Sequence, residues 1–164
     1  MAITEELLAR FSSEDLRMEH WIGDAGNGPI RVGYASKYRA QAFGERLENL
    51  VVLRLAELYL IRAEARLRSG NPSGARDDLN TVRRRAGIPP SAADDDALHS
   101  AIQEERQREL FAEWGHRWCD LKRWGILDSA MTSIKPHWAS SSALFPIPED
   151  QIRYNPYLTQ NPDY

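Results

Sequence analysis

Three glutamates offer the clearest possibility of chemistry in this sequence. Glu105, Glu109 and Glu113 recur every four positions, so on a helix their carboxylates would form one row. A glycosidase needs two carboxylates that face each other across a cleft, but arginines such as Arg106 and Arg108 flank this row. A neighbouring guanidinium holds a carboxylate ionised instead of raising its pKa. We therefore expect ion pairs and no catalytic residue, with a glycosidase that uses two of the glutamates as the catalytic alternative.

A second chemical pattern is the Glu-x-x-His spacing of Glu113 and His116, which also occurs in di-iron helical bundles. His116 and Asp120 are four residues apart, a spacing that is compatible with metal binding. The motif occurs once, whereas a di-iron site needs two copies and two further glutamates. The single cysteine, Cys119, excludes an intrachain disulfide and a multi-cysteine zinc site. We therefore expect no metal site and no cofactor.

The charges of the chain nearly balance, with 24 acidic and 21 basic residues and a net charge of −3. Three of the 21 basic residues are lysines, which leaves 18 arginines, and the guanidinium fork suits planar pairing with carboxylates. The triplet 83–85 is all arginine, but consecutive helical residues point in different directions, and Asp77 and Asp78 precede it. The composition therefore favours internal ion pairs and predicts no nucleic-acid partner.

Aromatic residues in irregular chain are the candidate ligand contacts. Trp21, Tyr34 and Tyr38 lie in a segment punctuated by glycines, and Trp138 lies in the loop-like stretch KPHWASSSA. Side chains in loops can be exposed, and an exposed tryptophan can stack on a sugar ring whose hydroxyls are bound by polar neighbours. Loop aromatics also commonly cover a core. Ligand binding and core packing therefore both stay open for these four residues.

The elements that position these residues are predicted to be helices. In the segment 49–69, apolar residues recur at spacings of three and four, the pattern of one helix face. They are Leu53, Ala56, Leu60, Ala63 and Leu67. Gly70 and Asn71 end this helix, and Pro72 begins a second one. The apolar face of the second helix holds Ala75, Leu79 and Val82. The pair is about as long as one tetratricopeptide repeat, which needs a further partner to bury its faces.

A third helix opens at SAADDDAL, where aspartates favour a helix start. Spacings of three and four continue it as one apolar seam, with Gly115 as a point where it could kink or split. The seam runs through Leu110, Trp114, Trp118, Leu121 and Trp124. We expect Trp114 and Trp118 to lie in the core, because aromatic stripes at helical spacing usually bury themselves.

The fold class is predicted to be all-α, in one domain over residues 1–164. It divides into an irregular lead-in at 1–47, a helical core at 48–128, and a loop with an extended C-terminal strap at 129–164. The side chains expected to pack the strap on the helices are Phe145, Ile147, Ile152, Tyr154 and Leu158. No apolar run approaches the roughly 20 residues that span a bilayer, and the first residues lack a signal-peptide pattern. The chain is therefore expected to be soluble.

Three ordered blocks of the sequence resemble the SusD/RagB family. They are VLRLAELYLIRAEARLRSGNPSGARDDLNTVRRRAGIP, EERQRELFAEWGHRWCDLKRWG and the closing PIPEDQIRYNPYLTQNPDY, and the shorter DLRMEHW and SKYR resemble the segment before them. The residues of the first two blocks that we expect in ion pairs or core are Arg54, Glu57, Glu64, Asn80, Arg83, Glu105, Arg106, Glu109, Trp114, Arg117, Trp118, Asp120 and Arg123. The last block contributes Asn155, Pro156, Gln160, Asn161 and Tyr164.

The resemblance implies an α-helical, tetratricopeptide-like fold in a nutrient-binding protein of Bacteroidetes-type bacteria. Such proteins are anchored by lipid to the outer membrane, face outward, and capture glycans or other nutrients for a TonB-dependent, SusC-like transporter. They are typically several hundred residues long and carry a lipoprotein signal, which this chain lacks, so the chain resembles a C-terminal part that is mainly scaffold. The alternative is a tetratricopeptide-like scaffold for protein partners that binds no glycan.

Overall fold

The computed structural model describes residues 2–25, 32–38 and 51–164 of the chain. The chain folds into two compact units, Met1–Trp114 and Gly115–Tyr164, whereas the sequence predicts a single domain. The division falls where the backbone turns sharply, with positive φ angles at Ala112, Trp114 and Gly115. The boundary between the units therefore lies inside the stretch that was expected to be one helix.

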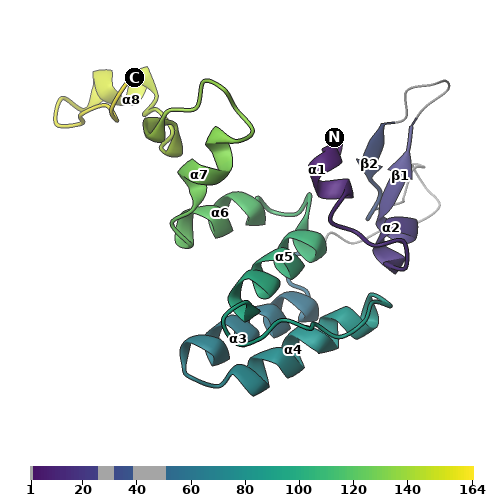
Figure 1. Ribbon diagram of the computed structural model, residues 1–164. Helices are drawn as coiled ribbons and strands as arrows, with labels where there is room; N and C mark the ends of the chain where they lie inside the picture. Colours follow the sequence, from purple (N-terminus) through teal and green to yellow (C-terminus); the bar gives the residue numbers. More distant parts are fainter. Residues whose placement is uncertain (1, 26–31, 39–50) are drawn as a thin grey trace. The chain divides into compact units, whose positions relative to one another are not determined.

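A helical hairpin forms the larger part of the first unit. Its helices are α3 (Leu55–Arg68) and α4 (Pro72–Arg85), and α5 (Leu98–Leu110) packs against both, as Figure 1 shows. Gly70 adopts a φ of 75° in the turn between them. The side chain of Asn71 accepts a hydrogen bond from a backbone N–H in the first turn of α4 and so caps that helix. The predicted all-helical fold with a helical hairpin is therefore confirmed.

The core of this hairpin is aliphatic and contains small side chains. Ala63 and Ala75 are fully buried, and their lack of bulk lets α3 and α4 approach closely. The buried residues of the core are Ala56, Leu60, Ala63, Ala75, Leu79, Val82, Leu98 and Ile102. Leu53, which the predicted stripe includes, precedes α3 and is 76% exposed. The predicted stripe is therefore correct from Ala56 onward and too long at its start.

Helix α3 also carries apolar residues on a second side. Leu55, Leu58 and Ile61 are 69%, 52% and 48% exposed. Their spacing of three places them on one face of the helix, while Leu60 and Ala63 face the core. An α-helix that is apolar on two sides is typical of one that has neighbours on both.

The N-terminal segment is more regular than predicted. It contains α1 (Glu5–Leu8), α2 (Leu16–Trp21) and an antiparallel pair of strands, β1 (Ile22–Asp24) and β2 (Gly33–Ala35), visible beside each other in Figure 1. The side chain of Asp15 caps α2 by accepting a hydrogen bond from the N–H of Arg17. Gly23 pairs with Tyr34 in the sheet, and the Tyr34 ring occupies the space that a Cβ on Gly23 would need. The described part of 1–47 therefore holds two short helices and a strand pair, which is more regular structure than the lead-in predicted from its glycines.

The second unit is built from short helices. They are α6 (His116–Arg123), α7 (Leu127–Thr132), a 3₁₀ turn at Ser140–Ala143 and α8 (Glu149–Tyr154). Its buried core consists of Leu121, Leu127 and Met131, against which Trp118 and Trp138 pack. In the described part of the chain, no helix is long and apolar enough to cross a membrane.

The C-terminal strap is tied together by side-chain hydrogen bonds to its own backbone. The amide of Gln160 both donates to the carbonyl of Ile147, at 2.9 Å, and accepts from its N–H, at 2.8 Å. Asn161 donates to the carbonyl of Phe145 at 2.6 Å. Tyr154 is 76% exposed, so the prediction that its side chain packs the strap on the helices is wrong. Phe145 is 78% exposed, but its ring centre lies 6.4 Å from that of Trp118 on α6.

The apolar seam predicted from Leu110 to Trp124 is not one helix. Helix α5 ends at Leu110, Phe111 takes an extended conformation, and α6 begins after Gly115. Gly115 has a left-handed φ of 68°, a conformation that glycine adopts at little cost. The spacing rule fails here because it assumes an unbroken helix, whereas the chain is not helical between Leu110 and His116.

The break also changes the predicted environment of Trp114. This tryptophan is 53% exposed, and its indole N–H donates to the backbone oxygen of Val51 at 3.2 Å, so it is not a core residue. Trp118 packs in the second unit instead. Of the predicted row of glutamates on one helix, Glu105 and Glu109 lie in α5, whereas Glu113 lies beyond its end.

Candidate functional site

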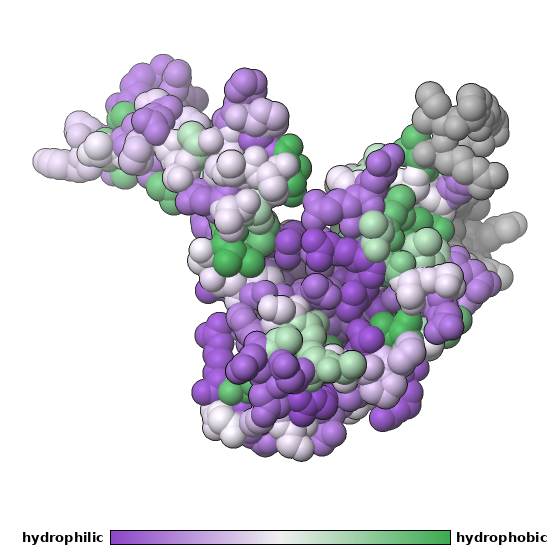
Figure 2. Space-filling model, in the orientation of Figure 1, coloured by the Kyte–Doolittle hydropathy of each residue, from purple (hydrophilic) through white to green (hydrophobic). Residues whose placement is uncertain are grey.

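Charged side chains, most of them buried, meet in the first unit around the C-terminal half of α5. This charge cluster consists of Asp15, Arg17, Lys37, Arg54, Arg83, Arg85, Glu105, Arg108, Glu109 and Glu113. Figure 2 shows strongly hydrophilic residues gathered over this end of α5. The members come from α2, the chain after β2, the start of α3, the end of α4, α5 and the turn after α5. The charge cluster therefore ties together segments that are far apart in the sequence.

Glu109 lies at the centre of the charge cluster and has no exposed surface. Its carboxylate accepts hydrogen bonds from Arg17 at 3.0 Å, Arg54 at 2.6 Å and Arg85 at 2.6 Å. Burial alone would raise the pKa of this carboxyl group, but the charge of Arg85 and the hydrogen bond and charge of Arg54 outweigh it, so the pKa lies below its usual value. Glu109 is therefore held ionised and is unsuited to act as a general acid.

Glu105 is the second fully buried carboxylate and has three arginine partners of its own. Arg17 lies at 2.7 Å, Arg108 at 2.9 Å and Arg83 at 3.2 Å. Arg17 also donates to Asp15, at 2.8 and 2.9 Å. Burial disfavours the charge of Arg17, but the hydrogen bond to Asp15 and the charge of Glu105 raise its pKa above the ordinary value. Arg17 is therefore a permanent cation that bridges three carboxylates, the third being Glu109.

Lys37 is the one lysine of the charge cluster. Its ammonium group donates to Glu113 at 2.6 Å and to the backbone oxygen of Glu109 at 2.7 Å. It also lies 4.4 Å from the ring centre of Trp21 and 4.1 Å from that of Phe111, within cation–π range. Burial lowers the pKa of Lys37 to about 8, although the hydrogen bond and charge of Glu113 oppose the change. Lys37 is therefore still mostly protonated at neutral pH.

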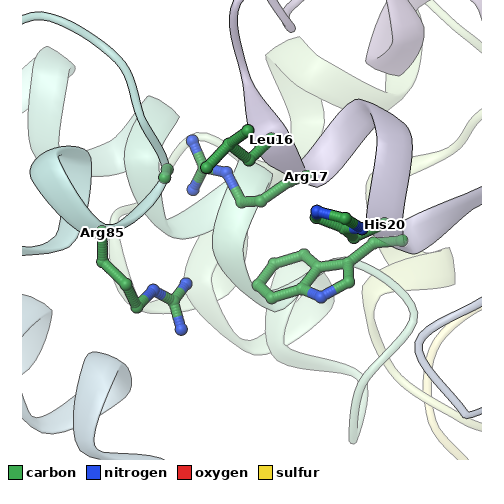
Figure 3. A pocket seen from close by; sticks show the side chains of 6 residues that line it. Leu16, Arg17, His20 and Arg85 are labelled. Carbon is green, nitrogen blue, oxygen red and sulfur yellow. The ribbon is translucent and has the colours of Figure 1, made fainter.

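A pocket of about 220 Å³ opens beside the charge cluster and is called the Trp21 pocket below. Its lining residues are Leu16, Arg17, His20, Trp21, Arg85 and Ala86. Figure 3 shows the side chains of Leu16, Arg17 and His20 coming from α2, and that of Arg85 approaching from α4. The guanidinium of Arg85 lies 5.3 Å from the ring centre of Trp21. The pocket therefore combines an aromatic wall with cationic groups.

The four aromatic residues predicted as ligand contacts have different surroundings. Trp21 lines the Trp21 pocket, whereas the Tyr34 ring packs over the sheet. Tyr38 is 43% exposed and its hydroxyl lies 3.4 Å from the backbone oxygen of Val51. Trp138 belongs to the second unit, where it packs edge-on against Trp118 at 6.0 Å. The structure thus places Trp21 in the wall of a pocket formed by described residues.

The remaining residues predicted as scaffold lie in both units. The side-chain oxygen of Asn80 accepts from a backbone N–H in the chain between α4 and α5, at 2.8 Å. Glu64 is 5% exposed and pairs with Arg68 at 2.8 Å, and Asp120 is 4% exposed and pairs with Arg123 at 2.8 Å. Glu57, Arg106 and Arg117 also have interaction partners.

Sequence reasoning missed four members of the charge cluster, namely Asp15, Arg17, Lys37 and Arg85. Arg85 was considered only as part of the arginine triplet 83–85. The other three stand in the short stretches DLRMEHW and SKYR, whose likeness to the segment before the three blocks was the available signal. Their partners on α5 are up to 92 residues away, and helical spacing carries no information over that distance. In the described part of the chain, no group of His, Cys, Asp and Glu side chains is arranged to hold a metal ion.

Comparison with known proteins identifies the family. The model of the SusD family matches residues 33–164, which contain Lys37 and every member of the charge cluster from Arg54 onward. The chain belongs to the SusD family. Among curated relatives, SusD-like protein P25 of Formosa agariphila is 32% identical over 130 residues, which are 70% of this chain and 24% of that protein. Starch-binding protein SusD of Bacteroides thetaiotaomicron is 32% identical over 135 residues, which are 71% of this chain and 22% of that protein.

Solved structures of SusD superfamily proteins have the same fold. One from Bacteroides vulgatus is 30% identical, with a TM-score of 0.73 over 98% of this chain and 38% of that chain. A SusD-like carbohydrate binding protein from the same species is 26% identical, with a TM-score of 0.63 over 75% of this chain and 27% of that chain. The chain therefore spans about a quarter of the length of the curated relatives named above.

Proposed function

We propose that this chain is part of a carbohydrate-binding protein that works in nutrient uptake at the outer membrane. In this proposal the whole protein is held at the cell surface by a lipid anchor and passes a glycan to a TonB-dependent, SusC-like transporter. The observation that carries the proposal is the match of the SusD family model to residues 33–164. Two relatives are named for binding starch and carbohydrate, which supports a glycan as the nutrient.

The contribution of this chain is mainly that of a scaffold. The buried glutamates Glu105 and Glu109 accept bonds from five arginines between them, which suits them to fix α2, α4 and α5 in place. A retaining or inverting glycosidase needs one carboxyl group with a raised pKa, whereas the pKa of Glu109 is lowered. We therefore infer binding without catalysis, and we assign the ligand contacts of this chain to the neighbourhood of Trp21.

Calorimetric titration of the chain with a panel of plant and microbial oligosaccharides tests this proposal. The matched variants are Trp21→Ala and Trp138→Ala, which remove the same side chain from different units. We expect millimolar or tighter binding of at least one glycan, lost in Trp21→Ala and kept in Trp138→Ala, with both variants shown to be folded by circular dichroism. Absence of binding to every glycan by the folded chain would refute ligand contacts in these residues.

A protein-interaction scaffold is the second candidate function. The exposed apolar row of Leu55, Leu58 and Ile61 on α3 favours it, because such a face suits a neighbouring helix. Under this alternative, no glycan binds, and a protein partner protects the row. The glycan titration distinguishes the two, because uptake requires glycan binding and the scaffold does not; slower hydrogen exchange of α3 on addition of a protein partner, in a folded chain that binds no glycan, would support the scaffold.

A further inference from the structure

We propose that the Trp21 pocket binds a sugar ring that carries a negative charge, a carboxylate or a sulfate. The inference rests on the proposed carbohydrate binding and narrows its substrate class to acidic glycans. The argument begins with the lining, which contains the arginines Arg17 and Arg85, the histidine His20 and, among the described residues, no carboxylate. The other three lining residues, Leu16, Trp21 and Ala86, are apolar.

Arg85 is the group that can bond to the anion directly. Its Nη2 atom lies 2.6 Å from both carboxylate oxygens of Glu109, so one nitrogen of the guanidinium serves the charge cluster. A guanidinium has five N–H donors in a planar fork, and the side chain of Arg85 is still 48% exposed. Within the described part of the chain, the hydrogen bonds of Arg85 use Nη2 alone, which leaves the donors of Nε and Nη1 for a ligand, in the geometry that suits a carboxylate or a sulfate.

Arg17 contributes charge rather than hydrogen bonds. Its donors are used by Asp15, Glu105 and Glu109, and its side chain is 3% exposed. The charge cluster beneath the pocket nevertheless holds six cations and four carboxylates among the described residues. Positive charge still exceeds negative charge when Glu104, 3.7 Å from Arg108 at the surface, is added. At the pocket itself, the lining formed by described residues contains two arginines and no carboxylate, which favours an anion.

The size and the apolar walls point to a ring as the carrier of that charge. About 220 Å³ is below the roughly 300–1,000 Å³ of pockets for drug-sized ligands, so the site suits one ring of a chain. Leu16 is 45% exposed, which gives the C–H face of a sugar an apolar surface to pack on. The partly exposed Trp21 borders this surface, with Lys37, Arg54 and Arg85 at 4.4–5.6 Å from its ring centre. A free inorganic anion would use the arginine and leave these walls empty.

The test is a calorimetric titration of the chain with four probes at low ionic strength: digalacturonate, a sulfated galactose, the neutral digalactose and inorganic sulfate. We expect both acidic sugars to bind at least about tenfold tighter than the neutral one, as the loss of one charge-assisted hydrogen bond implies. Their affinity should fall as salt is added, because exposed charges are screened. Inorganic sulfate should bind more weakly than the sulfated sugar.

Two variants test whether the binding is in this pocket. Arg85→Gln should weaken binding of digalacturonate about tenfold, whereas its exposed neighbour Arg84, changed to Gln with the same loss of charge, should leave the affinity within about twofold. Because Arg85 also supports Glu109, Leu16→Trp is the second variant: it fills the pocket, removes no charge from the charge cluster, and should abolish binding. Thermal melts establish that each variant is folded.

The possible failures separate this inference from the proposed function. Equal affinity for digalacturonate and the neutral sugar, or unchanged affinity in both pocket variants, overturns the acidic-sugar site while leaving carbohydrate binding in place. Inorganic sulfate that binds as tightly as the sulfated sugar overturns recognition of the ring. Absence of binding by any sugar in the probe set and in the wider oligosaccharide panel overturns both the inference and the proposed function.

Discussion

Replacement of Glu109 by glutamine should be one of the most damaging conservative changes in the first unit. Glu109 has no exposed surface, and its carboxylate serves Arg17, Arg54 and Arg85 at 2.6–3.0 Å. Removing one partner of a buried ion pair costs about 3–5 kcal/mol, because the other partner is left buried and uncompensated. An amide has the same size, so the variant opens no cavity, but it removes the charge and replaces one acceptor oxygen by an NH2 donor that faces the arginines.

The structure places the expected loss at the lower end of that range. Arg17 keeps Asp15 and Glu105, and Arg54 keeps Glu113. Arg85, with a side chain that is 48% exposed, can turn its guanidinium to water. We therefore expect the free energy of unfolding to fall by about 3 kcal/mol in Glu109→Gln.

Urea denaturation followed by far-ultraviolet circular dichroism measures this loss. The matched control is Glu104→Gln on the same helix, since Glu104 is 53% exposed and 3.7 Å from Arg108. Exposed pairs of this kind contribute about 0–1 kcal/mol. A loss below about 1 kcal/mol in Glu109→Gln, or a loss equal to that of the control, would refute the view that the charge cluster holds the first unit together.

Three further changes test other features of the structure. Lys37 has a pKa of about 8 in the folded chain, below its ordinary value of 10.5. Between pH 8 and pH 10.5 the unfolded state therefore binds more protons than the folded state, so the contribution of Lys37 to the free energy of unfolding rises with pH over this range. Urea curves of Lys37→Met should lack that rise, and identical pH slopes in the two proteins would contradict the assigned burial. Asn71→Ala removes the cap of α4 and should lower the free energy of unfolding by about 1 kcal/mol in the same assay; no change would mean that the Asn71 side chain contributes nothing to the helix. Gly115→Ala adds a Cβ that meets no atom within 4 Å, so any loss of stability should come from the left-handed backbone alone. We expect a destabilisation of about 1–2 kcal/mol in a thermal melt, and a neutral result would argue against that backbone conformation.

The helical hairpin could be predicted from the sequence because its signals are local. Gly70, Asn71 and Pro72 mark the turn between the helices, and the small apolar residues that face the core recur at helical spacing. The structure agrees with these positions to within one turn. Helix-ending residues and apolar periodicity suffice to predict such an element, since it is stabilised by contacts between residues that are close in the sequence.

The break after α5 could not be predicted from spacing. The residues from Leu110 to Trp124 fit a continuous helix, but Ala112 and Trp114 adopt positive φ angles that non-glycine residues rarely take. At Trp114 this backbone conformation occurs together with a hydrogen bond from the indole to Val51, which is 63 residues away in the sequence. The apolar spacing fits each of the helices α5 and α6, but it carries no information on the turn between them.

The candidate site was predicted in part. Pairing of the glutamates on α5 with arginines followed from composition, and Trp21 was named as a ligand candidate. The pairing of Arg17 with Glu105 and of Lys37 with Glu113 spans 88 and 76 residues, so it depends on tertiary packing that the sequence does not display. The Trp21 pocket arises from that same packing, because it needs α2 to lie against the end of α4.

The order of the charge cluster along the chain has a consequence for synthesis on the ribosome. Arg17, Lys37, Arg54, Arg83 and Arg85 all emerge before Glu105, Glu109 and Glu113, and Glu109 follows Arg17 by 92 residues. At roughly 5–20 residues per second, the first arginine waits on the order of 5–20 s for its partner. The hairpin of α3 and α4 can fold meanwhile, but α2, which carries Arg17, cannot form its ion pairs with α5 until Glu105 and Glu109 leave the exit tunnel. The charge cluster of the first unit therefore forms last, once α5 is available. A chain truncated before Glu105 would leave the arginines of the charge cluster without their glutamate partners.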